Sequence, residues 1–195
     1  HIATIEYALE YIYEPKKSLI VQREVGVDTV SFEAALNSAF RHDVDVILVG
    51  EMRNADTIST AVTAAETGHL VLSTLHTNNA AQTIDRIIDS FPATQQDQIR
   101  IQLAGSLAGI FSQRLIPSIA GGLVPAYELL INNNAVANLI RESTTNQLQT
   151  LIETGMGQVM IDMNRSLAQM VKDGIITVEN AFAYSTNPKG LERIM

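Results

Sequence analysis

Two ionisable side chains directly follow two apolar segments of this 195-residue sequence. Glu51 comes after the run VILV at residues 46–49, with only Gly50 between, and His76 comes after the run at residues 70–75. A carboxylate and an imidazole are side chains that act in acid–base chemistry. Glu51 taken alone fits a solvated turn equally well, but a second junction of the same kind, ending in a histidine, favours a functional site.

The elements that must position Glu51 and His76 are two short strands and the helix between them. Residues 46–49 have the β-branched profile of a strand buried on both faces in a parallel sheet. Residues 55–67 predict a helix that is ended by Gly68, and residues 70–75 predict the next strand. In open α/β sheets the ligand crevice lies outside the carboxyl ends of the strands. We therefore expect Glu51 and His76 to meet at one edge of the sheet.

The segments before residue 46 predict further elements of the same sheet. Residues 2–5 indicate a buried strand that closes on the carboxylate of Glu6, and residues 19–21 indicate a short edge strand. Ser31 is a good N-cap for a helix whose apolar stripe includes Phe32 and Leu36. This order of elements predicts an α/β fold, a mostly parallel sheet with helices on both faces.

Beyond residue 76 the pattern changes to helices and one hairpin. Apolar residues at helical spacing predict helices at residues 79–89 and 95–111, and residues 112–116 and 124–131 predict a hairpin. From residue 132 the sequence reads as helical, and the methionine stripe Met160, Met163 and Met170 indicates core filling rather than a binding surface. We therefore predict a core domain of residues 1–131 and a small, mainly helical region of residues 132–195.

Composition limits the classes of function. The 13 Lys and Arg residues are scattered and the net charge is −8, which disfavours a nucleic-acid surface, because phosphate binding needs clustered cations. No apolar run approaches the ~18 residues of a membrane span. The sequence contains no cysteine, which excludes disulfides and cysteine zinc sites. The chain begins at His1 within an apolar segment, and we expect it to start inside a longer polypeptide.

Four segments together resemble the motor ATPases of secretion systems and type IV pili. They are HIATIEYALEY (residues 1–11), QREV (22–25), DVDVILVGEMRNADT (43–57) and AAETGHLVLSTLHT (64–77). They look like the aspartate box, the atypical Walker B box and the histidine box of that family, in the family's order and spacing. Such linked motifs are far more specific than a lone pattern. The first box departs from the family pattern, because Tyr7 and Ala8 stand where the family has Asp-Pro.

Within that family the chain is most similar to the PilT-type retraction ATPases. AVANLIRE (residues 135–142) and DGIITVENA (173–181) resemble helical segments of those motors. The assembly and secretion branch commonly carries a four-cysteine zinc insert, which this chain lacks. The resemblance implies a RecA-like ATPase that hydrolyses ATP with Mg²⁺ and drives type IV pilus retraction and twitching motility. It also implies a homo-hexamer at the cytoplasmic face of the inner membrane, peripheral rather than inserted, with the inner-membrane pilus platform protein as partner and no nucleic acid.

The resemblance and the strand ends together suggest roles for four side chains. Glu51, at the end of the Walker B strand, would orient or activate the attacking water. Glu10, in the first box, would be a second carboxylate near Mg²⁺ and that water. His76 would sense the γ-phosphate, and Glu6 is a further nucleotide-binding candidate. We assign no metal site formed by protein side chains alone.

Two further polar residues have structural alternatives. Arg53 is a candidate for phosphate binding, and the alternative is an ion pair with an acid such as Asp56. His69 precedes the strand that ends at His76, and we expect it to organise the loop or a subunit contact.

No sequence of the form GxxxxGK[ST] occurs in the chain. The backbone N–H groups and lysine of such a P-loop hold the β- and γ-phosphates, so nucleotide binding without them should be very poor. In the resembled family the P-loop lies upstream of the first box. We therefore expect these residues to be the carboxy-terminal part of a longer ATPase and to be inactive alone.

Other functions remain open at this stage. The chain could belong to a pilus assembly or type II secretion ATPase, or to a non-catalytic ring or adaptor subunit of the same fold. It could also belong to a translocase or conjugation-type relative that moves protein or DNA, although the scattered charge argues against DNA.

Overall fold

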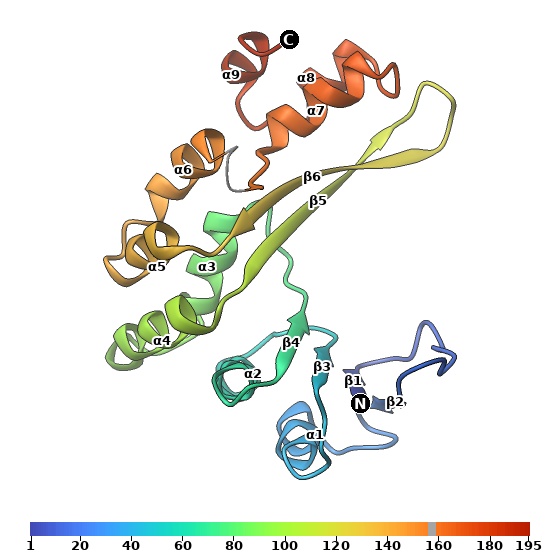
Figure 1. The fold of residues 1–195 in the computed structure, drawn as a ribbon, viewed down its shortest axis with the longest axis vertical. Helices are drawn as coiled ribbons and strands as arrows, with labels where there is room; N and C mark the ends of the chain where they lie inside the picture. The colour runs from blue at the N-terminus through green and yellow to red at the C-terminus, as the bar shows by residue number, and fades with distance from the viewer. Residues whose placement is uncertain (156–158) are drawn as a thin grey trace. The chain divides into compact units, whose positions relative to one another are not determined.

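The computed structural model describes residues 1–155 and 159–195 (Figure 1). Residues 156–158, which we predict as part of the helical region, lie outside the described residues. The chain forms two compact units. The first contains His1–His76 and Arg86–Leu107, and the second contains Thr77–Asp85 and Ala108–Met195. The domain boundary after residue 131 stays a prediction.

A parallel sheet of four strands forms the framework of the first unit. The strands are β1 (Ile2–Glu6), β2 (Ile20–Glu24), β3 (Val46–Val49) and β4 (Leu70–Ser73), in the order β2-β1-β3-β4. All three strand pairs are parallel, which confirms the predicted α/β class. The register pairs Ile5 with Val49 and Val49 with Ser73. Strands β1, β3 and β4 therefore end at the same edge of the sheet.

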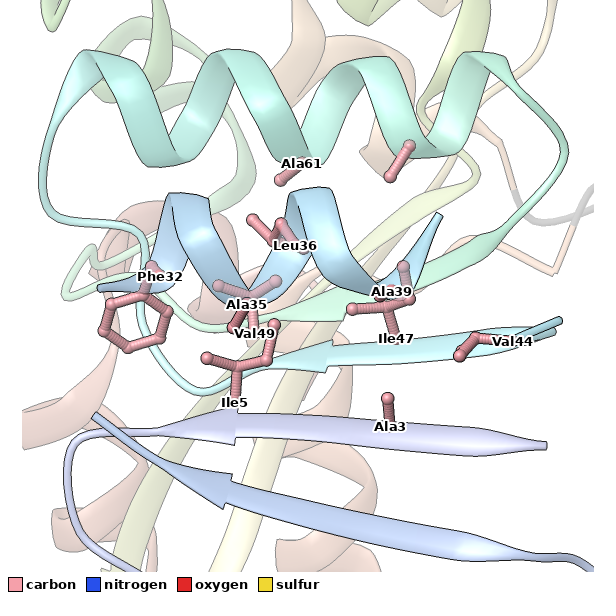
Figure 2. Close-up of a cluster of buried hydrophobic side chains, with 11 residues drawn as sticks. Ala3, Ile5, Phe32, Ala35, Leu36, Ala39, Val44, Ile47, Val49 and Ala61 are labelled. Carbon is pink, nitrogen blue, oxygen red and sulfur yellow. The ribbon is translucent and has the colours of Figure 1, made fainter. Parts of the chain in front are cut away.

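Helices α1 (Phe32–Ala39) and α2 (Ala55–Glu66) pack on this sheet. Ser31 caps α1 as predicted, because its side chain accepts a hydrogen bond from the Ala34 N–H, and Asn54 caps α2 through the Thr57 N–H. The buried cluster between helices and strands is drawn in Figure 2 and consists of Ala3, Ile5, Phe32, Ala35, Leu36, Ala39, Val44, Ile47, Val49, Ala61 and Ala64. Each large aliphatic side chain buried here stabilises the unit by roughly 1.5–3 kcal/mol.

Two further helices follow, α3 (Ala80–Asp89) and α4 (Ala93–Ser106). The predicted helix at residues 95–111 is wrong at its end, because Leu107 already has extended backbone angles and Ile110 lies in a strand. The sequence does not show where the helix ends and the strand begins, because the apolar residues keep helical spacing across this boundary at Leu103, Leu107 and Ile110.

The second unit contains a long antiparallel hairpin and short helices. Strands β5 (Gly109–Pro117) and β6 (Leu123–Ile131) pair along their whole length, which confirms and extends the predicted hairpin. Gly121 and Gly122 form its turn with positive φ angles of 91° and 75°, a conformation that favours glycine.

Helical segments follow the hairpin in the second unit. They are α5 (Asn134–Arg141), a 3₁₀ turn (Thr145–Gln147), α6 (Leu148–Thr154), α7 (Met163–Lys172), α8 (Val178–Tyr184) and α9 (Pro188–Glu192). Met160, Met163 and Met170 are all buried, so the methionine stripe fills a core as predicted. Residues 188–192 form α9, which Asn187 caps by accepting a hydrogen bond from the Gly190 N–H. Within the described ranges, no helix is both long and apolar enough to cross a membrane.

Candidate functional site

The loop that follows β3 is held between the ends of β1 and β4. The Gly50 N–H donates to the Ile5 carbonyl at 2.8 Å, and the Thr74 hydroxyl donates to the Gly50 carbonyl at 2.5 Å. A Cβ atom at Gly50 would lie 3.2 Å from the Ile5 carbonyl oxygen, so the close approach of these strands favours a residue without a side chain. The backbone that carries Glu51 is therefore fixed by both neighbouring strands.

Glu51 contacts two of the other predicted site residues. Its Oε1 lies 3.1 Å from His76 Nε2, and its Oε2 accepts a hydrogen bond of 2.6 Å from Arg53 Nε. The Glu51 side chain is 17% exposed, whereas that of His76 is 87% exposed. The structure thus brings Glu51, His76 and Arg53 together at the carboxyl edge of the parallel sheet.

Arg53 forms the ion pair that the sequence left open, with Glu51 rather than Asp56 as its partner. The hydrogen bond to Glu51 raises the pKa of the Arg53 guanidinium above its usual range, so this residue is a permanent cation at the site. Each carboxylate oxygen of Glu51 has two lone pairs and uses one of them here. The carboxylate therefore keeps the capacity to accept a hydrogen bond from a water molecule.

Tyr7 is a member of this cluster that sequence reasoning missed. The Arg53 Cζ atom lies 4.2 Å from the centroid of the Tyr7 ring, and the ring meets Phe32 edge to face at 4.7 Å. The available signal was the aromatic residue directly after β1, at the same sheet edge as Glu51. Using it requires knowing that β1 and β3 are neighbours, which the sequence order alone does not show.

Glu6 and Glu10 have no contact with this cluster among the described residues. Glu6 accepts hydrogen bonds from Thr4 Oγ1 at 2.6 Å and from Gln22 Nε2 at 3.3 Å. Glu10 is exposed in the loop between β1 and β2, and within the described part of the chain its side chain has no hydrogen-bond or ion-pair partner. The roles of both glutamates stay predictions.

His69 lies at the opposite end of β4 from His76. Its Nδ1 lies 3.1 Å from the Ala64 carbonyl oxygen, and its ring meets Phe40 at 5.5 Å. These contacts tie the end of α2 to the strand that follows, which is the loop-organising role that we expect for this residue.

The cluster offers side chains that could orient water and approach an anion. A fixed carboxylate can orient a water molecule, and an adjacent guanidinium and imidazole can approach an anion such as a phosphate. Across the described residues, no group of three or more histidine, aspartate or glutamate side chains is placed to hold a metal ion.

Comparison with known proteins places these observations in a family context. The family model described as "Type II/IV secretion system protein" matches residues 1–121. The chain is 48% identical to a "Twitching motility protein" of Neisseria gonorrhoeae over 192 residues, which cover 98% of this chain and 51% of that protein. It is 50% identical to the "Type IV pilus retractation ATPase PilT" of Pseudomonas aeruginosa over 181 residues, which cover 93% of this chain and 53% of that protein.

A solved structure supports the same family relationship. The crystal structure of the pilus retraction motor PilT with bound ADP superposes on this chain with a TM-score of 0.90 at 54% sequence identity. The match covers 99% of this chain and 55% of that one. The chain therefore spans about half the length of the curated relatives and of the structure that it matches.

Proposed function

This chain belongs to the Type II/IV secretion system protein family, and on that premise we propose that the intact protein is an ATPase that drives type IV pilus retraction. The observation that carries the hydrolytic part is the cluster of Glu51, Arg53 and His76 at the carboxyl edge of the sheet. The similarity to retraction motors along nearly the whole chain supports the direction of movement.

Glu51 is proposed to orient the water that attacks the terminal phosphate of ATP. Phosphoryl transfer depends mostly on positioning and on stabilisation of charge, so a fixed carboxylate beside the phosphate suits the reaction. His76 contacts Glu51, as Arg53 does, and its side chain is largely exposed. It can therefore contact the γ-phosphate and respond to its loss. Arg53 and Glu6 complete the set of nucleotide-binding candidates.

Glu10 is proposed as a second carboxylate near the Mg²⁺ ion and the attacking water. Mg²⁺ is commonly bound by one or two carboxylates plus substrate phosphates, and the described structure leaves the Glu10 side chain unpaired. The ion would neutralise charge on the phosphates when bound. Because the P-loop sequence does not occur among these residues, tight nucleotide binding is proposed for the intact protein only.

We also propose an assembly and a location for the intact protein. The resemblance to motor ATPases suggests a homo-hexameric ring at the cytoplasmic face of the inner membrane, in contact with the pilus platform protein. Mass measurement of the native intact protein tests the ring. A monomer at micromolar concentration with ATP and Mg²⁺ would contradict it.

The catalytic proposal is tested by Glu51→Gln in the intact protein. The amide keeps the shape of the side chain but removes its basic carboxylate, so ATP turnover should fall by about 10²–10⁴-fold while ATP binding persists. The matched control is Glu14→Gln, which changes an exposed glutamate of the same unit and should leave turnover unchanged. If the Glu51→Gln variant hydrolysed ATP at the wild-type rate, the catalytic role assigned to Glu51 would be wrong.

The direction of movement is tested in cells. Cells that lack the gene should keep their pili and fail to withdraw them. Loss of the pili themselves would indicate an assembly motor instead.

A further inference from the structure

Arg53 is held by two different groups at the sheet edge. Glu51 accepts a hydrogen bond from its Nε at 2.6 Å, and the Tyr7 ring lies under its guanidinium at 4.2 Å. The Arg53 side chain is 57% exposed, and a long exposed side chain normally samples several rotamers. A planar guanidinium can stack on a ring and donate in its plane at the same time, so the two contacts restrict it together.

The Tyr7 ring is itself fixed to the core of the first unit. It packs edge to face on Phe32, with an interplanar angle of 67°. Phe32 is buried and belongs to the cluster drawn in Figure 2. Tyr7 also follows β1 directly, and β1 accepts the Gly50 N–H through Ile5. The ring and the loop that carries Glu51 are therefore attached to the same strand.

The two partners of Glu51 are not equally restrained. His76 is 87% exposed, and among the described residues Glu51 is its only hydrogen-bond or ion-pair partner. Arg53 has the additional contact with Tyr7. Arg53 is consequently the partner that fixes the orientation of the Glu51 carboxylate.

We infer that Tyr7 is a positioning residue for hydrolysis: it holds Arg53 in place, and Arg53 holds the Glu51 carboxylate in the orientation that activates water. This inference rests on the proposed ATPase function. It assigns a role, exerted through Arg53, to the first residue after β1.

The first test compares Tyr7→Leu with Tyr7→Phe in the intact protein. Leucine removes the aromatic face, so kcat for ATP should fall about 3- to 10-fold. Phenylalanine keeps the face, and its kcat should stay within about 2-fold of wild type. Tyr13→Leu is the matched control, since Tyr13 lies in the same loop with similar exposure and contacts Tyr11 instead of Arg53.

The second test combines Tyr7→Leu with Arg53→Ala. If Tyr7 acts through Arg53, Tyr7→Leu should not lower kcat further once Arg53 is alanine. The same fractional loss of kcat in both backgrounds, accompanied by an equal drop in melting temperature, would mean that Tyr7 only supports the core and would overturn the inference.

The outcomes separate this inference from the proposed function. If wild type hydrolyses ATP and Glu51→Gln does not, but Tyr7→Leu keeps the wild-type kcat, only the role of Tyr7 is wrong. If the intact wild-type protein does not hydrolyse ATP, the proposed function is wrong and the inference falls with it.

Discussion

The two units of this protein hold their key carboxylates in opposite ways. Glu51, in the first unit, lies at a strand end and meets a guanidinium and an imidazole. Glu128, in strand β6 of the second unit, is 2% exposed and accepts a hydrogen bond of 2.9 Å from the Ala80 N–H at the start of α3. Among the described residues, Glu128 has no cation within ion-pair distance.

Burial has an electrostatic consequence for Glu128. Loss of hydration raises the pKa of its carboxyl group, and the neighbouring Asp162 and Glu153 add to that rise. The Ala80 N–H and the charge of Arg114 oppose it without cancelling it. The difference between the two glutamates suggests a division of roles. The partly exposed, cation-paired carboxylate is suited to chemistry, and the buried one is suited to joining a helix start to a strand.

Among the variants that test this comparison, the largest effect is expected from disturbing the backbone beside Glu51. In Gly50→Val, the new side chain would press against the Ile5 carbonyl and the Glu6 backbone, and the Glu51 loop would have to move. A misplacement of about 1 Å can cost on the order of 10²-fold in rate, so ATP turnover of the intact protein should fall by about that factor.

Gly105→Val is the matched control for this prediction. Gly105 lies in α4 of the same unit, and a Cβ atom there would meet nothing within 4 Å. Its turnover should stay near wild type. Equal turnover in the two valine variants would show that the position of the Glu51 loop does not limit hydrolysis.

A smaller effect, on stability rather than turnover, is expected from Glu128→Ala. The Ala80 N–H would lose its partner in a buried place, which should lower the free energy of unfolding by about 1–3 kcal/mol. Glu128→Gln keeps an acceptor oxygen and should retain most of this stability. Chemical denaturation at neutral pH measures both changes.

The control for the buried glutamate is Glu142→Ala. Glu142 is an exposed residue at the end of α5, and its substitution should change the free energy of unfolding by less than about 0.5 kcal/mol. If Glu128→Ala cost no more than this control, the contrast between a structural and a chemical carboxylate would be wrong.

The smallest expected effect is a dependence of stability on pH. Because the pKa of Glu128 in the folded protein is raised above its ordinary value of 4.5, the folded protein binds this proton more tightly than the unfolded chain. Stability relative to Glu128→Gln should therefore increase as the pH falls through the raised pKa and level off below the ordinary one. Denaturation series over this range measure the difference, and a constant difference would contradict the raised pKa.

The sequence predicts the meeting of Glu51 with His76 because the signals for it are local. The apolar runs at residues 46–49 and 70–75 predict two parallel strands, and the meeting of Glu51 with His76 follows from their parallel pairing. The predicted end of the second strand is wrong by two residues, because β4 ends at Ser73. The ion-pair partner of Arg53 was harder to predict from the sequence. Glu51 lies two positions before Arg53 in the sequence, and their contact depends on how the loop turns.

The features that sequence reasoning missed depend on strand neighbours or on tertiary burial. The contact of Tyr7 with Arg53 requires β1 and β3 to be adjacent. The burial of Glu128 did have a sequence signal. Glu128 lies on the same face of β6 as Ala126 and Leu130, and all three residues are buried. A charged residue on an otherwise apolar strand face therefore indicates a buried partner, here the Ala80 N–H.

The pairing of Val49 with Ser73 also limits which changes of chain length the protein can tolerate. A one-residue insertion within β3 or β4 would move the strand end by about 3.3 Å and turn the following side chains to the opposite face, separating Glu51 from His76. Homologues that retain this pair should therefore align through residues 46–51 and 70–76 without gaps. Insertions and deletions should instead collect at the exposed glycine turn of the hairpin, where no partner strand constrains them.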